Sequence, residues 1–249
     1  MMKGNDCMEI KEMLLTHNRP RTKRKKTTAI AVHYVGNAGS SALGNRNYFQ
    51  NTSTSVSSHY VIGLEGEIIR CIPEDEVSWC TNQANSYTIS IECCHPHDDG
   101  IFNDKTYKSL VELCADICKR WNLNPLNGGI IRHFDVTGKV CPRGFVAKSK
   151  GGTDDNSCTR YHKFLNDVAT AIGQTTTEFK PYLVKITSDD GFVNIRKTPK
   201  FVDSDIVGKI ENSKIKYTIV AEATIEGVRF GELKSGAGWI ALSCTTKAE

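Results

Sequence analysis

Two histidines and one cysteine stand where a metal site could form. His33 lies near the end of the β-branched segment TTAIAVHYV (27–35), and His133 ends the segment GIIRH (129–133). Cys141 follows eight residues after His133, across the turn-forming stretch HFDVTGKVC. A catalytic zinc ion, Zn²⁺, needs three protein ligands and an open fourth position, and two imidazoles with one thiolate suit its charge and softness. These residues therefore indicate a zinc site, although a histidine at a strand end is often only a hydrogen-bonded structural residue.

Glu92 is the candidate for proton transfer. It stands at the exit of the segment YTISIEC (87–93), whose apolar residues should face a core. A carboxylate next to a zinc ion can take a proton from water and later deliver it to a leaving amide nitrogen. The alternative is a strand-end glutamate that faces solvent.

Strands that alternate with helices should bring these residues together. The segments 59–64 and 67–72 predict a hairpin with Glu65-Gly66 as its turn. Helical spacing of apolar residues predicts helices over 104–121, with Asp104 as N-cap, and over about 160–172. The polar stretch 36–45 should be a loop. This pattern is typical of an α/β layered domain, in which adjacent strand ends open onto a common crevice.

A second domain should follow a linker. The polar stretch GQTTTEFK (173–180) has no apolar period and marks the linker between domains over 1–172 and 181–249. The later part contains short β segments at 182–186, 193–196, 206–210, 216–221, 228–233 and 238–242. Short strands separated by turns predict a small all-β barrel or sandwich.

Composition narrows the class of protein. The chain has 39% hydrophobic and 24% charged residues, as soluble globular proteins do, and its apolar runs are too short for membrane insertion. A net charge of +4 gives little reason to expect nucleic acid. The basic run RTKRKK (21–26) is best interpreted as solvated, with contact to an anionic wall polymer as the alternative. Without an apolar signal segment, the ten cysteines should be reduced and synthesis should be cytoplasmic, without a signal peptide.

Four stretches between residues 29 and 142 carry a family pattern. They are AIAVHYVG (29–36), SSHYVIGLEGEIIRCIP (57–73), YTISIEC (87–93) and RHFDVTGKVCP (132–142). In this order they resemble the type 2 N-acetylmuramoyl-L-alanine amidases, the family of phage endolysins, prophage lysins and peptidoglycan recognition proteins.

The resemblance implies a fold and a set of site residues. It implies a mixed central sheet flanked by helices and a catalytic zinc ion bound by His33, His133 and Cys141. It also implies a catalytic role for Glu92. Because the non-enzymatic recognition proteins usually lack the cysteine ligand, Cys141 favours an enzyme.

Three further residues lie near these motifs. Lys139 stands where similar enzymes carry a lysine, and its ammonium could stabilise an oxyanion or simply be solvated. Some relatives carry a catalytic tyrosine where this chain has Ser58, which makes Glu92 more important. We expect His59 to pack beside the site or to support it.

The remaining thiols are expected to be structural. Cys114 and Cys118 are four residues apart on the predicted helix and should be small buried residues. A second metal site could be built from neighbouring cysteines and histidines, but no paired cluster with zinc-finger spacing accompanies them, and packing is the favoured interpretation. These residues are Cys93, Cys94, His95 and His97.

The C-terminal segment resembles the bacterial SH3-type domains of cell-wall hydrolases. The marks are PYLVKIT (181–187), VNIRKTP (193–199), the strand at 206–210 and GELKSGAGWIAL (231–242). The resemblance implies a small SH3-like barrel that binds the cell wall and raises the local concentration of substrate. Its aromatic residues could be core or binding surface. They are Tyr182, Phe230 and Trp239.

Together these features predict a zinc hydrolase that cleaves the N-acetylmuramoyl-L-alanine amide bond of bacterial peptidoglycan. Zinc would polarise the lactyl carbonyl and activate water, Glu92 would shuttle the proton and Lys139 would stabilise the oxyanion. The chain would act at the cell wall as an endolysin released through a holin, or as a host autolysin. The alternatives are a non-catalytic peptidoglycan-binding receptor and a zinc peptidase that cuts within the stem peptide.

Overall fold

A computed structural model of the chain describes residues 8–174, 179–225 and 228–248. The chain divides into two compact units, one of residues 1–154 with 160–176 and the other of residues 155–159 with 177–249. Four residues of the predicted linker, 175–178, lie outside the described residues. No helix in the described part of the chain is long and apolar enough to cross a membrane.

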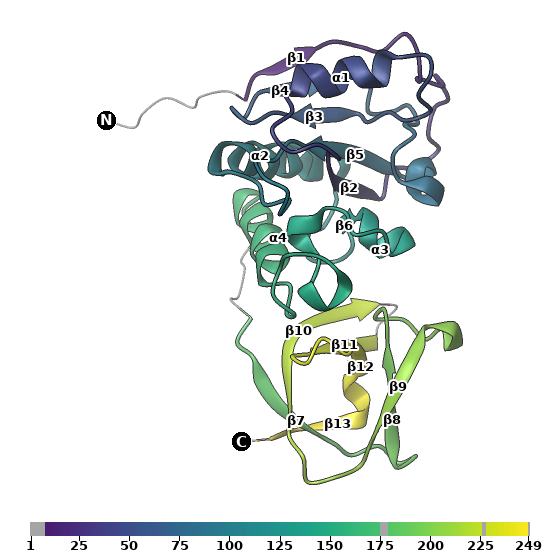
Figure 1. Cartoon of the computed structure of the whole chain (residues 1–249). Helices are drawn as coiled ribbons and strands as arrows, with labels where there is room; N and C mark the ends of the chain where they lie inside the picture. The colour runs from purple at the N-terminus through teal and green to yellow at the C-terminus, as the bar shows by residue number, and fades with distance from the viewer. Residues whose placement is uncertain (1–7, 175–178, 226–227, 249) are drawn as a thin grey trace. The chain divides into compact units, whose positions relative to one another are not determined.

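A six-stranded sheet forms the centre of the first unit, and Figure 1 shows its strands stacked from β1 to β6. The hairpin strands β3 and β4 pair antiparallel, whereas all other neighbours are parallel, so the predicted mixed sheet is confirmed. The order is β1 (Ile10–Glu12), β4 (Ile68–Arg70), β3 (Tyr60–Ile62), β5 (Thr88–Cys93), β2 (Ala29–Tyr34) and β6 (Ile130–Arg132).

The three strands β5, β2 and β6 lie side by side and parallel, and they position the site. β2 and β5 are buried along nearly their whole length. The sequence of β2 (AIAVHY) is mostly apolar, as expected for a strand buried on both faces, whereas β5 (TISIEC) alternates polar and apolar residues. Their register places His33 directly beside Glu92. β6 pairs with the other side of β2 and ends at Arg132, one residue before His133. The carboxyl ends of all three strands therefore meet at one edge of the sheet.

Helices cover both faces of this sheet. Phe49 of α1 (Ala42–Gln50) packs in one apolar cluster with Val61 of β3. The neighbouring Tyr60 instead donates a hydrogen bond to Glu74, which also binds Arg120 of α2 (Asp104–Trp121). Because successive strand residues point to opposite faces, α1 and α2 lie on opposite sides of the sheet. Val61 pairs with Glu92, so the site lies on the α1 side.

Several local predictions need correction. The first turn of α1 falls in the predicted loop 36–45, and Ser41 caps this helix by accepting the Gly44 N–H at 3.1 Å. The N-cap of α2 is Asn103, which accepts the Thr106 N–H at 2.9 Å, because Asp104 is already helical. His133 does not end a strand but begins the short helix α3 (His133–Thr137). The last helix of this unit, α4, spans Thr159–Ala171, close to its prediction.

The second unit is a seven-stranded, entirely antiparallel sheet in the order β13-β7-β10-β11-β12-β8-β9. Its strands are β7 (Tyr182–Ile186), β8 (Phe192–Arg196), β9 (Ile206–Glu211), β10 (Tyr217–Ile225), β11 (Val228–Leu233), β12 (Trp239–Ala241) and β13 (Thr245–Ala248). Alternate aliphatic side chains fill a separate core that includes Val184, Ile219 and Ile240. Phe230 is buried, and Tyr182 and Trp239 are half-buried. The strand β13 was not predicted.

Candidate metal centre

Three side chains converge at the carboxyl edge of β2 and β6. His33 Nδ1 lies 3.2 Å from His133 Nδ1 and 3.6 Å from Cys141 Sγ, and all three residues are buried. Zinc bonds of about 2.0–2.1 Å to nitrogen and about 2.3 Å to sulfur at tetrahedral angles require N···N near 3.3 Å and N···S near 3.6 Å. These two distances therefore fit a tetrahedral zinc ion. Its ligands would come from the end of β2 (His33), the start of α3 (His133) and a loop (Cys141).

The outer nitrogens of both imidazoles are held by one loop. His33 Nε2 lies 2.9 Å from Thr81 Oγ1, and His133 Nε2 lies 2.9 Å from Asn82 Oδ1. Because an amide oxygen only accepts, His133 carries its hydrogen on Nε2 and leaves the Nδ1 lone pair facing the centre. Outer partners of this kind fix the tautomer and orientation of metal-binding histidines. Sequence reasoning missed both Thr81 and Asn82, since nothing in their spacing marks them.

Burial sets the charge of the three groups. Desolvation, followed by the charges of His133 and Lys139, holds the pKa of His33 well below its usual value. Desolvation and then Lys139 also lower the pKa of His133, so both imidazoles are neutral near pH 7. Desolvation and the nearby Glu92 raise the pKa of the Cys141 thiol to about 12. The thiol thus needs a cation at this position to become a thiolate.

Glu92 lies beside this centre on β5. Its Oε1 accepts a hydrogen bond from Cys80 Sγ at 3.5 Å, and its buried Oε2 has no hydrogen-bond partner among the residues that the structure describes. Burial raises the pKa of Glu92 to about 8, although the Cys80 bond and the charge of Lys139 oppose this shift. Burial and then Glu92 raise the pKa of the Cys80 thiol, which is therefore a donor rather than a thiolate. A carboxylate with one orphaned oxygen and a pKa near neutrality is suited to accept and release a proton.

Lys139 is exposed, unlike the other predicted site residues. Its ammonium makes no hydrogen bond or ion pair with any residue that the structure describes, yet its charge lowers the pKa of His33 and His133. It therefore lies close to the centre with its charge unneutralised.

The two hairpin residues are buried away from these ligands. Ser58 Oγ donates to the Ser90 carbonyl at 3.0 Å. His59 accepts the Ser90 N–H on Nδ1 at 3.0 Å, and its Nε2 lies 2.9 Å from the Glu76 carbonyl. Burial and then Arg24 lower the pKa of His59 to about 3. The expected packing role of His59 fits these contacts, because Ser90 lies on the same strand as Glu92.

Four of the remaining thiols lie in the core. Cys114 and Cys118 are buried in α2, as predicted, and Cys93 and Cys94 are buried at the end of β5. Among the described residues, two groups could hold a metal ion: His33, His133 and Cys141, and a second that shares His33 with Cys80 and Glu92. Neither group includes His95, whose ring nitrogens instead lie within hydrogen-bond distance of the carbonyls of His97 and Val35.

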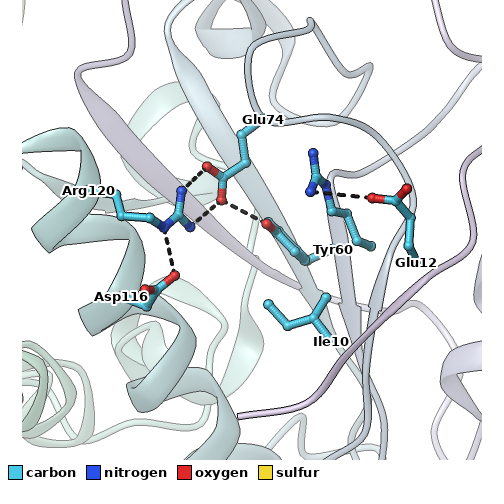
Figure 2. Close-up of a pocket in the computed structure, with 7 residues that line it drawn as sticks. Ile10, Glu12, Tyr60, Glu74, Asp116 and Arg120 are labelled. Carbon is cyan, nitrogen blue, oxygen red and sulfur yellow. Dashed lines mark hydrogen bonds and ion pairs between the residues drawn. The ribbon is translucent and has the colours of Figure 1, made fainter. Parts of the chain in front are cut away.

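A cavity of about 340 Å³ lies on the α2 side of the sheet, away from this centre. Figure 2 shows Glu74 at its wall, where the carboxylate meets Tyr60 from β3 and Arg120 from α2. Glu74 also accepts the Trp121 indole N–H at 2.7 Å. Both carboxylate oxygens are satisfied by these donors, so we interpret this cluster as a joint between α2 and the sheet.

Comparison with known families agrees with this geometry. Residues 23–144 match the family described as N-acetylmuramoyl-L-alanine amidase, and the matched region contains His33, Glu92, His133 and Cys141. This part of the chain, just under half of it, is therefore similar to that family. Curated relatives are named N-acetylmuramoyl-L-alanine amidases, in agreement with the prediction of an enzyme.

Individual amidases show how far the similarity extends. The amidase CwlL of Bacillus licheniformis is 34% identical over 150 residues, which cover 53% of this chain and 41% of CwlL. The amidase BlyA of Bacillus subtilis (strain 168) is 26% identical over 232 residues, 83% of this chain and 62% of BlyA. The chain thus spans less than two thirds of either relative. The solution structure of the PlyG catalytic domain shares the fold, with a TM-score of 0.55 and 22% identity over 69% of this chain and 100% of that domain.

Proposed function

We propose that this chain is a zinc-dependent N-acetylmuramoyl-L-alanine amidase that acts on bacterial peptidoglycan. The strongest support is the buried set of two Nδ1 atoms and one Sγ atom at tetrahedral spacing, next to a carboxylate with an orphaned oxygen. The family match supports the choice of bond, because it covers all four of these residues.

Each residue has a distinct part in the proposed reaction. His33, His133 and Cys141 would hold zinc, which when bound polarises a carbonyl and lowers the pKa of water to about 7. Glu92 accepts the proton on its buried, unpartnered Oε2 and later delivers it to the leaving nitrogen. Lys139 places an unneutralised ammonium near the centre, where it can stabilise negative charge on the substrate oxygen.

Two other functions share part of this evidence. A non-catalytic peptidoglycan receptor would need neither a zinc-type donor set nor a buried base, so the complete set favours an enzyme. A zinc peptidase that cuts within the stem peptide would use the same groups. Only the identity of the broken bond separates the amidase from the peptidase.

Mass spectrometry of digested walls tests the proposal. The zinc-loaded full chain should release stem peptides with a free amino-terminal L-alanine and leave muramic acid with an intact lactyl group. Cys141→Ser should release neither product. Peptides cut within the stem would make the chain a peptidase, and wall binding without any product would make it a receptor.

We also propose that the second unit is an SH3-type cell-wall-binding domain and that the protein acts as an endolysin or autolysin. The antiparallel sheet of short strands supports this proposal, as does the alignment with BlyA, which is long enough to reach into the second unit. A wall-bound second unit would raise the effective concentration of substrate at the first.

A further inference from the structure

Three consecutive side chains contact three different groups of the candidate centre. They lie in the segment 80–85, called here the positioning loop, which runs into the short 3-10 helix η1 (Asn82–Ser86) before β5. The contacts are Cys80 Sγ to Glu92 Oε1 at 3.5 Å, Thr81 Oγ1 to His33 Nε2 at 2.9 Å, and Asn82 Oδ1 to His133 Nε2 at 2.9 Å.

The positioning loop is itself held in place. Asn85 Oδ1 accepts the backbone N–H groups of Cys80 at 3.1 Å and Thr81 at 2.6 Å. Gln83 Nε2 donates to the Val136 carbonyl at 3.0 Å, which ties the loop to α3. Asn82 has a φ of 53°, a left-handed conformation that asparagine tolerates better than most residues. The residue at position 82 must therefore adopt a left-handed backbone conformation and also carry a hydrogen-bond acceptor on its side chain.

We propose that Cys80, Thr81 and Asn82 are positioning residues: Thr81 and Asn82 aim the Nδ1 atoms of the two histidines at a zinc ion, and Cys80 holds the carboxylate of Glu92. The part that concerns Glu92 rests on the proposed amidase function. The part that concerns the histidines rests only on metal binding.

The chemistry of imidazole explains why the outer contacts matter. A neutral histidine has one N–H and one lone pair, and an acceptor at Nε2 keeps the hydrogen there and the lone pair on Nδ1. Without Asn82 Oδ1, the ring of His133 is free to rotate or to carry its hydrogen on Nδ1, which blocks coordination. Loss of such a partner typically weakens metal binding about 10–100-fold.

Two substitutions at Asn82 separate the acceptor from the backbone. Asn82→Gly keeps the left-handed conformation at no steric cost but removes the acceptor. Asn82→Asp keeps an acceptor oxygen at the same distance along the side chain. Ser86→Ala is the matched control, because Ser86 is exposed just beyond the loop and its Oγ only donates to the Gln83 carbonyl.

Competition with a chromophoric chelator measures the zinc affinity of the full chain. This affinity tests the proposal that the positioning residues orient the histidines. We expect Asn82→Gly to bind zinc about 10–100-fold more weakly and Asn82→Asp to stay within about threefold of the original chain. Ser86→Ala should not change the affinity. Zinc bound by Asn82→Gly as tightly as by the original chain would overturn this part, whether or not the protein cleaves peptidoglycan.

The variants Cys80→Ala and Cys80→Ser test the proposal that Cys80 holds the carboxylate of Glu92. In zinc-loaded crystals, Glu92 should leave its position in Cys80→Ala and keep it in Cys80→Ser, whose hydroxyl still donates. Both variants should keep zinc, and Cys80→Ala should lower kcat about tenfold or more on soluble muropeptide at unchanged KM, with rescue by serine. Loss of zinc from Cys80→Ala would make Cys80 a ligand, and an unmoved Glu92 would make its contact incidental. Either result overturns the positioning role.

Discussion

At the scale of single residues, the centre contains two imidazoles and one thiol, which burial keeps neutral. Beside them lies one carboxylate that lacks, among the residues described, a hydrogen-bond partner on one of its oxygens. Both histidines present Nδ1 inward, and the Cys141 thiol lies within 3.6 Å of His33 Nδ1. Within the described part of the chain, Glu92 Oε2 has no hydrogen-bond partner. Such an arrangement is costly in an apolar interior unless a cation or a reacting group completes it.

Glu92→Gln should keep the fold and the zinc but lower kcat about 10²–10⁴-fold, because an amide cannot accept the proton. The base acts only when ionised, and burial raises its pKa to about 8. A zinc ion beside Glu92 opposes this shift, so in the zinc-loaded enzyme kcat/KM should decline at a pH between the usual pKa of 4.5 and about 8. A pH profile of both proteins checks this, and near-normal turnover by Glu92→Gln would make Glu92 structural.

Zinc binding should release about one proton per ion near pH 7. Both imidazoles are already neutral there, whereas the Cys141 thiol, with its pKa raised to about 12, must lose its proton to bind. Affinity should therefore rise about tenfold per pH unit. Calorimetry in buffers of different ionisation enthalpy measures the proton count, and Cys141→Ala should release none. A count of zero for the original chain would exclude Cys141 as the ligand.

The four central residues could be predicted because each belongs to a family motif, and three of them lie in a strand or directly after one. His33, Glu92, His133 and Cys141 lie together as expected. Thr81 could not be predicted, since a hydroxyl that orients a histidine leaves no pattern in the sequence. Its role depends on a loop that only tertiary structure brings to the sheet edge.

At the scale of elements, the site depends on three parallel strands that end together and on the helices that fix the sheet. The joint between α2 and β3 is the clearest of these contacts, because Glu74 binds donors from both elements. Burial opposes ionisation of Glu74, but hydrogen bonds from Arg120, Trp121 and Tyr60 outweigh it and lower the pKa to about 2.

Glu74→Gln should lower the free energy of unfolding by about 1–3 kcal/mol at pH 7, since it leaves buried donors poorly matched. A depressed pKa contributes stability above the ordinary value of 4.5, and this contribution is lost as the pH falls towards about 2. The difference between the two proteins should therefore shrink below about pH 4.5. Urea unfolding at several pH values measures this difference in the free energy of unfolding. The substitution Glu12→Gln, at an exposed position, is the control. An equal effect of both substitutions would contradict the interpretation that Glu74 connects α2 to the sheet.

Helices and strands could be predicted where a periodic pattern of apolar residues extends over many residues. The helix over Asp104–Trp121 shows seven buried residues at helical spacing, and its predicted bounds are correct. The helix α1 was not predicted, because only three of its nine residues are buried and its sequence ALGNRNYFQ is mostly polar. The edge strand β1 has three residues without a buried one, too short for any pattern.

At the scale of the whole molecule, the two units have separate cores and separate sheets. All residues of the candidate centre lie in the first unit. This separation supports the proposal that the first unit cleaves peptidoglycan and the second unit binds the cell wall.

Residues 1–175 alone should therefore fold, bind zinc and cleave soluble muropeptides at near-normal rates, yet lyse intact cells poorly. The lost lysis reflects the lost effective concentration at the wall. Residues 180–249 fused to a fluorescent protein should label walls without lysing them. If the fragment clears cells as fast as the full chain and the fusion does not label walls, the anchoring proposal is wrong.

The central claim is that His33, His133 and Cys141 bind a catalytic zinc ion, and X-ray absorption at the zinc edge of the active full-length protein tests it most directly. The spectrum should show two nitrogen neighbours at about 2.0–2.1 Å and one sulfur at about 2.3 Å. The sulfur shell should disappear in Cys141→Ser together with amidase activity. Full activity in metal-free protein, or a bound zinc ion without a sulfur neighbour, would contradict the account.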